Sequence, residues 1–148
     1  MNNFRLIWIF YTILCLFFYI GCVGPPEDEY GPVITNTPEL FKYYLNCDDE
    51  KYSSEDSYEL DLVLLDSLHK VITSLIVSDY AGSNQDTSII ITVENDSSIA
   101  DIFYIKANYS TPHSETPVDS VFYFPKKVSI KTNQFIGNME FMMVRSNI

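Results

Sequence analysis

The sequence predicts a mainly β protein: a small antiparallel β-sandwich with one short helix near the start of the domain. Three observations support this class. Short segments rich in Val, Ile, Thr, Tyr and Phe alternate between apolar and polar side chains, as strands with one buried face do. Polar turn clusters separate these segments about every 8–12 residues, the spacing of small all-β domains. Residues 37–148 are also long enough for one domain with its own core.

The first predicted element is a short helix over residues 37–46. Thr37 is a suitable N-cap, Pro38 suits the first helical position, and Glu39 complements the helix N-terminus. The apolar side chains of this segment form one helical stripe: Leu40, Phe41, Tyr44 and Leu45. The highly charged residues 48–57 have no periodicity, which predicts an exposed loop.

Residues 58–78 fit two patterns. Leu60, Leu64, Leu68, Val71 and Leu75 recur at a helical spacing. Alternation at 58–64 and again at 71–77 fits strands instead. The density of β-branched side chains in 71–77 and the polar break at residues 66–67 favour a β-hairpin, with a helix as the alternative.

The rest of the chain reads as strands and turns. Residues 88–94 place Ile89, Ile91 and Val93 on one face, and residues 95–98 form a turn. The other predicted strands are 100–109, 121–124, 128–132 and 139–144, with turns or loops at 79–86 and 110–119. This arrangement resembles the immunoglobulin-like or transthyretin-like sandwich in outline.

The N-terminal segment carries an export pattern. Arg5 precedes 15 uncharged, mostly apolar residues, which are followed by Gly21 and Cys22. This pattern resembles the signal peptide of bacterial lipoproteins. The resemblance implies that residues 1–21 are removed and that Cys22 becomes a lipidated N-terminus carrying palmitate-type acyl chains. An uncleaved signal anchor over residues 6–24 and cleavage with release are the alternatives.

The same resemblance implies a location and a domain plan. Arg5 stays on the cytoplasmic side, so the chain after Cys22 lies outside the cytoplasm, in the bacterial cell envelope, anchored to the outer membrane by lipid. Residues 22–36 are rich in proline and acids, which predicts an extended tether. Residues 37–148 form a single β-rich domain.

Charge and cysteine content narrow the function. After Cys22 the chain has 20 acidic and eight basic residues, which argues against a nucleic-acid partner. Cys47 is the only thiol left once Cys15 is removed with the signal and Cys22 is lipidated, so no disulfide within the chain is expected.

No catalytic residue, metal site or cofactor is assigned. The two histidines, His69 and His113, match no catalytic or metal-binding motif, and a dyad of either with Cys47 is unconstrained by the sequence. Acidic clusters at 48–56 and 79–86 lack EF-hand spacing, so calcium binding stays an alternative. We do not expect an enzyme, and a hydrolase is the third reading.

Aromatic side chains on the later strands give the candidate binding face. Its residues are Tyr104, Tyr109, Phe122, Tyr123 and Phe124. The leading hypothesis is a cell-envelope lipoprotein whose domain serves non-catalytic binding, or an accessory or assembly role, toward a protein or glycan. The alternative is an inhibitor or immunity-type lipoprotein that directs an acidic face against a basic enzyme or toxin.

Overall fold

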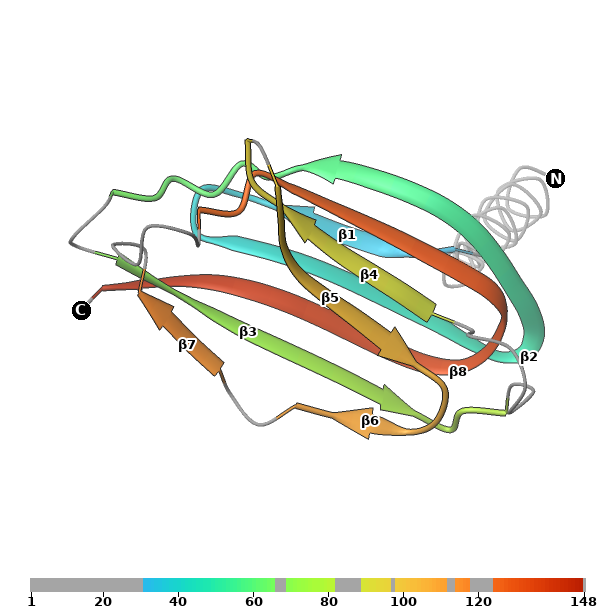
Figure 1. Cartoon of the computed structure of the whole chain (residues 1–148). Helices are drawn as coiled ribbons and strands as arrows, with labels where there is room; N and C mark the ends of the chain where they lie inside the picture. Colours follow the sequence, from blue (N-terminus) through green and yellow to red (C-terminus); the bar gives the residue numbers. More distant parts are fainter. Residues whose placement is uncertain are drawn as a thin grey trace, which may run out of the picture. The chain divides into compact units, whose positions relative to one another are not determined.

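Eight antiparallel strands in one sheet make up the regular structure of the described chain (Figure 1). The computed structural model describes residues 31–65, 69–81, 89–96, 98–111, 114–117 and 124–147. These ranges all belong to the second of two units, Met1–Tyr30 and Gly31–Ile148. Within the described ranges, no helix has the length and apolar character needed to cross a bilayer.

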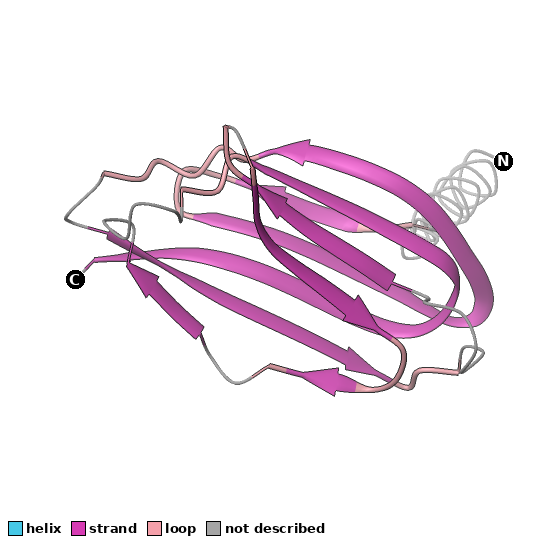
Figure 2. Ribbon diagram, viewed as in Figure 1, coloured by secondary structure: helices cyan, strands magenta, loops and turns pink. Residues whose placement is uncertain are grey.

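The long strand β8 organises the sheet (Figure 2). The strands are β1 (Val33–Asn36), β2 (Leu40–Glu59), β3 (His69–Ser78), β4 (Ile89–Glu94), β5 (Ile99–Ile105), β6 (Tyr109–Ser110), β7 (Ser114–Pro117) and β8 (Lys127–Asn147). One side of β8 pairs with β2 along most of its length, and the other side pairs first with β4 and then with β3. The shorter strands extend the sheet: β1 on β2, β5 on β4, and β6 and β7 on β3.

The sheet folds back on itself. Phe41 and Tyr58 lie on the same strand, where a straight path would separate them by roughly 55 Å. Their ring centroids are 5.8 Å apart, so β2 must turn back between them, as Figure 1 shows. We call the two halves the first arm and the second arm. The first arm holds β1, β3, β6, β7, residues 40–47 of β2 and residues 137–147 of β8; the second holds β4, β5, residues 52–59 of β2 and residues 127–135 of β8.

The bend lies where both long strands depart from regular geometry. On β2 the register shifts between Cys47 and Ser54. On β8, Gln134 and Gly137 have positive φ angles of 49° and 131°. A Cβ atom at Gly137 would lie 2.7 Å from the backbone oxygen of Ser78, so only glycine fits there.

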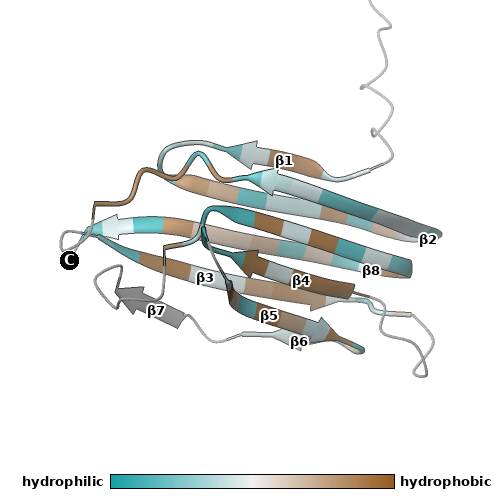
Figure 3. Cartoon of the chain, turned by 45° about the horizontal axis from the view of Figure 1, so that its top comes forward, coloured by the Kyte–Doolittle hydropathy of each residue, from teal (hydrophilic) through white to brown (hydrophobic). Residues whose placement is uncertain are grey.

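The core lies between the facing arms. Inward side chains alternate with outward ones, seen as alternating bands of hydropathy along the strands in Figure 3. Phe103 of β5 packs against Phe141 of β8 with centroids 6.0 Å apart, and Tyr43 packs against Tyr58 across the fold. Apolar contact between the arms therefore stabilises the fold-back.

The predicted helix over residues 37–46 is wrong, because this segment enters β2. Phe41, Tyr43 and Leu45 are fully buried, at the two-residue spacing of a strand. Thr37 does cap the chain, since its Oγ1 accepts hydrogen bonds from the amides of Glu39 and Leu40. The cap closes the turn between β1 and β2, so the local signal is real but belongs to a β-turn.

The predicted loop at 48–57 is also wrong, because these residues continue β2. In 58–78, the strand character of 71–77 is confirmed by β3, but the hairpin is not formed. The end of β2 and β3 each pair with β8, which lies between them. Leu62 and Leu64 are buried although residues 60–65 lie outside any strand.

The later predictions agree better with the structure. The 88–94 prediction is confirmed by β4, with Ile89, Ile91 and Val93 buried. The turn at 95–98 is confirmed by the hydrogen bond from the Asn95 amide to the Ser98 carbonyl. Several boundaries differ, since 100–109 divides into β5 and β6, 110–119 includes β7, and 128–132 and 139–144 join in β8.

The predicted two-sheet sandwich is not confirmed, because the described strands form one folded sheet. The antiparallel, mainly β class is shown. The sheet also begins earlier than expected, since β1 lies within the predicted tether, where it pairs with residues 41–44. Residues 121–123 of a predicted strand lie outside the described residues, and Phe124 follows them outside any strand.

Candidate binding surfaces

The predicted aromatic face is divided by the fold. Tyr104 and Tyr109 are 60% and 39% exposed, on β5 and β6. Directly paired residues point to the same side of a sheet. Tyr104 pairs with the outward Ile90, whereas Tyr109 pairs with the buried Val77. The two tyrosines therefore belong to different arms and different faces.

Phe124 is partly buried rather than part of an exposed aromatic face. Its side chain packs against the core, and the ammonium of Lys126 lies 4.3 Å from its ring centroid. Phe122 and Tyr123 lie outside the described residues. The structure therefore places three of the five predicted residues and does not gather those three in one patch.

A different exposed feature includes Tyr104. On β5, Ile99, Ile102 and Tyr104 are 62%, 37% and 60% exposed. Their direct partners on β4 are the outward residues Glu94, Thr92 and Ile90. The three β5 residues therefore lie on the outer face of the second arm. We call Ile99, Ile102 and Tyr104 the β5 stripe. Phe103 points the other way, into the core.

The β5 stripe lies at an edge of the described sheet, since β5 pairs only with β4 among described strands. The carboxylate of Asp101 accepts a hydrogen bond from the Ile102 amide at 2.8 Å. A side chain that occupies an edge amide blunts the edge against indiscriminate strand pairing. Contacts at this surface therefore depend mainly on the outward side chains.

A groove lined by both polar and apolar residues occupies the outer face of the first arm. Its volume is about 420 Å³, and its lining residues are Tyr44, Asn46, Ile76, Ser78, Asn138, Met139 and Glu140. The strand register explains this set. Glu140 of β8 pairs with Tyr44 of β2 and Ile76 of β3, and the adjacent row contains Asn46, Asn138 and Ser78.

Charged and polar contacts hold the groove side chains in place. Lys42 forms an ion pair with Glu140 at 3.0 Å, and its ammonium lies 5.8 Å from the Tyr44 ring centroid. The amide nitrogen of Asn138 donates to the Asp79 carboxylate at 3.3 Å. The groove was missed in the sequence because a helix over 37–46 would not align Tyr44 and Asn46 on one strand face.

The Cys47 and His69 dyad, which the sequence left unconstrained and which was not predicted, is not assembled. Cys47 pairs with Gly137 and His69 with Asn147, so the two lie opposite points of β8 separated by about 33 Å of strand. Both side chains are buried. His113 lies outside the described residues.

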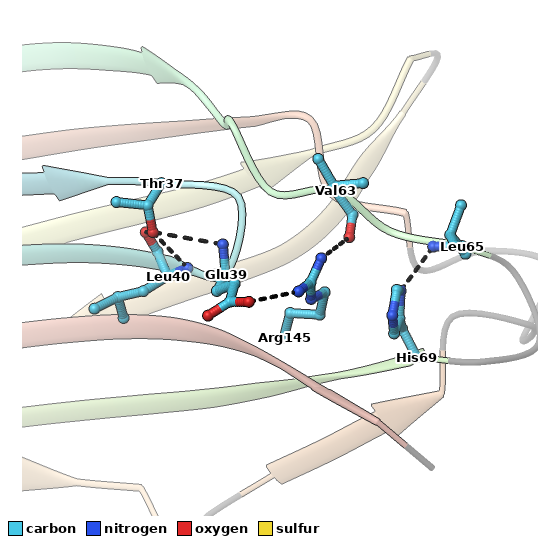
Figure 4. Close-up of polar contacts among 7 residues, drawn as sticks. All are labelled: Thr37, Glu39, Leu40, Val63, Leu65, His69 and Arg145. Atoms are coloured by element: carbon cyan, nitrogen blue, oxygen red, sulfur yellow. Dashed lines mark hydrogen bonds and ion pairs between the residues drawn. The ribbon is translucent and has the colours of Figure 1, made fainter.

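His69 has a structural contact instead, beside a loop that Arg145 holds (Figure 4). Its Nδ1 accepts a hydrogen bond from the Leu65 amide at 2.9 Å. Arg145 donates to the Val63 carbonyl at 3.2 Å and pairs with Glu39 at 2.8 Å. These contacts fix residues 60–65 over the strand ends.

A polar group is also buried between the arms. Tyr43 is fully buried, and its hydroxyl has no hydrogen-bond partner within 3.5 Å among the described residues. The nearby Ser54 side chain slightly counters the rise in its pKa. Burial, and then the nearby Tyr52, Tyr58 and Asp56, raise the pKa of Tyr43 well above its usual range. Burial also raises the pKa of Tyr58 to about 12, with Asp56 the next contributor.

The calcium alternative depends on acidic side chains at 48–56 and 79–86. Within the described ranges, no group of three or more His, Cys, Asp or Glu side chains is arranged to hold a metal ion. Asn84 and Asp86 of the second acidic cluster lie outside those ranges.

Comparisons with known proteins give one structural similarity. No family model matches the chain, and no curated protein matches it. A chain in the crystal structure of accessory secretory protein 1, 2 and 3 in Streptococcus pneumoniae is 16% identical, with a TM-score of 0.29. The match covers 86% of this chain and 92% of that chain. Similarity at this level assigns no function.

Proposed function

We propose that this chain is a lipoprotein of the bacterial cell envelope whose β domain acts by non-catalytic binding to a partner protein. The observation that carries the binding role is the β5 stripe, where three large apolar side chains are exposed together on one strand face. Contiguous exposed apolar side chains on an otherwise polar surface are typical of interaction sites.

The partner is a protein that offers an apolar contact surface. Ile99, Ile102 and Tyr104 give a linear apolar contact, and tyrosine adds a hydroxyl that remains polar at an interface rim. Because Asp101 occupies the Ile102 amide, the interaction uses side chains rather than an added strand. A basic residue of the partner near Asp101 would complement the charge there.

The membrane anchor of this proposal is Cys22. An apolar segment after Arg5 and the Gly21–Cys22 pair support lipidation, and two or more acyl chains suffice for stable attachment. Mass spectrometry of the native N-terminus tests it. An acylated Cys22 that is absent from the Cys22→Ser variant is the expected result, and an intact Met1 terminus in both proteins would contradict it.

Photocrosslinking in the source cell tests the binding surface. A photoreactive side chain at Tyr104 should capture a discrete partner protein, whereas the same group at Ser57 should not. Ser57 is a matched control because it is exposed, outward and also on the second arm. Equal capture from both positions, or no capture from Tyr104, would contradict the proposal.

The inhibitor alternative rests on a different surface. Outward side chains at Glu55, Glu59 and Asp61 give the end of β2 and the loop after it an acidic face, and Lys131 neutralises only Glu55. Binding through this face would weaken steeply as salt is raised. Binding through the β5 stripe would persist in salt and be lost in Tyr104→Lys.

A further inference from the structure

We infer that the groove on the outer face of the first arm is a binding site for a neutral saccharide. This site is separate from the β5 stripe, which lies on the second arm. The inference starts from the two rows of outward side chains that β8 aligns across three strands. One row has Tyr44, Glu140 and Ile76, and the other has Asn46, Asn138 and Ser78.

The dimensions suit a small polar ligand. Neighbouring strands are about 4.8 Å apart and outward residues recur about every 6.8 Å along a strand. Six side chains in two rows over three strands thus cover an area comparable with one or two sugar rings. The groove volume of about 420 Å³ falls within the range of small-molecule sites.

The chemistry matches sugar hydroxyls, which both donate and accept hydrogen bonds. The side chains of Asn46 and Ser78 likewise offer both donors and acceptors, whereas Asn138 has its Nδ2 on Asp79 and its Oδ1 buried. Glu140 adds carboxylate oxygens, of which Oε2 faces Lys42. Lys42, on the neighbouring row, reaches Glu140 and brings a further donor close to the groove.

Apolar contacts complete the match. Ile76 is 46% exposed at the end of one row, and the Tyr44 ring stands at the other end. A sugar ring presents C–H groups on its faces and hydroxyls at its rim, so apolar walls with polar groups between them fit it. A purely apolar ligand would cover the Asn46 and Ser78 side chains without offering them hydrogen bonds.

The site is rigid before a ligand arrives. Lys42 is held by Glu140 and lies beside the Tyr44 ring, and Asp79 holds the amide nitrogen of Asn138. The strands beneath it are anchored by fully buried side chains that point inward from the same segments: Tyr43, Leu45, Leu75, Met139 and Phe141. Preorganised side chains lower the entropy cost of binding. The carboxylate of Glu140 favours a neutral sugar over an acidic one.

The test is an NMR titration of the purified full-length protein in detergent. The probes are short neutral oligosaccharides built from glucose, mannose, galactose, xylose or N-acetylglucosamine. We expect at least one series to shift the amide signals of Tyr44, Asn46 and Asn138. Asn46→Ala should weaken that binding about tenfold, as loss of one hydrogen-bonding group does.

Two further variants make the result specific. Ile76→Lys should abolish binding by removing an apolar wall, and Ser57→Lys, at an exposed position on the second arm, should leave it unchanged. If Ile76→Lys fails to fold, Asn46→Ala decides the test, since Asn46 is exposed and has no core contact to lose. The inference is overturned if no series shifts the groove signals, or if binding is equal in the wild type and Asn46→Ala.

Discussion

The two arms of the folded sheet are alike on their inner faces, which pack against each other, and different on their outer faces. Inside, both contribute alternating apolar side chains, and Phe103 of one arm meets Phe141 of the other. Outside, the first arm carries a groove of mixed polar and apolar lining beside an ion pair, whereas the second carries an apolar stripe at its edge. The inner faces are constrained by packing, so the two arms differ mainly in the chemistry of their outer faces.

The largest expected effect comes from the bend that separates the arms. Gly137→Ala would place a Cβ atom 2.7 Å from the Ser78 oxygen and 2.9 Å from the Asp79 oxygen, at a φ of 131°. Backbone atoms at the end of β3 cannot yield without moving the strand. We expect destabilisation of about 4 kcal/mol or more, measured by urea unfolding.

Gly31→Ala is the matched control for Gly137. Its φ is 142°, also rare for residues with side chains, but no atom lies within 4 Å of the added Cβ. Backbone strain alone should cost about 1–2 kcal/mol. Equal losses in the two variants would show that the close approach at the bend contributes nothing.

A core truncation compares inside with outside. Phe141→Ala removes a fully buried ring that contacts Phe41 and Phe103, so it loosens both arms. We expect a loss of about 3–5 kcal/mol in the free energy of unfolding. Tyr104→Ala, on the exposed stripe, should change it by no more than about 0.5 kcal/mol. A large loss at Tyr104 would mean that the stripe is structural rather than a free surface.

Asn36 joins the arms at one side. Its side chain donates to the Glu59 carbonyl at 2.7 Å and accepts from the Asp61 backbone amide at 3.0 Å. The Asn36 side-chain amide thus makes the two hydrogen bonds that the backbone of a neighbouring strand would make. Asn36→Ala should cost about 1–3 kcal/mol, because two backbone groups lose their partners. Asn36→Asp keeps only the acceptor and should fall between alanine and the wild type. Thermal unfolding of the three proteins measures the order, and a neutral Asn36→Ala would contradict the role.

The sequence predicts individual strands better than their arrangement. Ile89, Ile91 and Val93 could be identified because alternation is a local property and tertiary contact agrees with it. Thr37 led to the wrong helix prediction, because a hydroxyl that accepts hydrogen bonds from nearby amides can either cap a helix or close a β-turn. The fold-back of β2 was hidden by the polar residues 48–57, which resemble a loop although alternate positions face outward.

The candidate surfaces differ in how far local pattern could reveal them. Tyr104 was singled out from its strand alone, and its exposure can be understood from β5 alone. The groove needs Tyr44, Ile76 and Glu140 to meet in one row, which depends on the register of three strands distant in sequence. Such a row cannot be predicted until the central position of β8 is known.

The smallest expected effect concerns the phenols between the arms. The pKa of Tyr43 and that of Tyr58 are both raised, so the folded protein keeps these protons at a pH where the unfolded chain, with a tyrosine pKa near 10, loses them. The unfolded state then binds fewer protons, and stability falls as pH rises. This contribution is fully present below pH 10 and is lost progressively from there toward pH 12 and above.

Tyr43→Phe tests that pH dependence. At neutral pH the variant should stay within about 1 kcal/mol of the wild type, because the buried hydroxyl it removes has no hydrogen-bond partner in the described part of the chain. Above pH 10 its unfolding free energy should decline less steeply, since one phenol with a raised pKa is gone while Tyr58 remains. Urea unfolding at a series of pH values measures both slopes. Parallel decline in the two proteins would show that Tyr43 does not govern the alkaline loss.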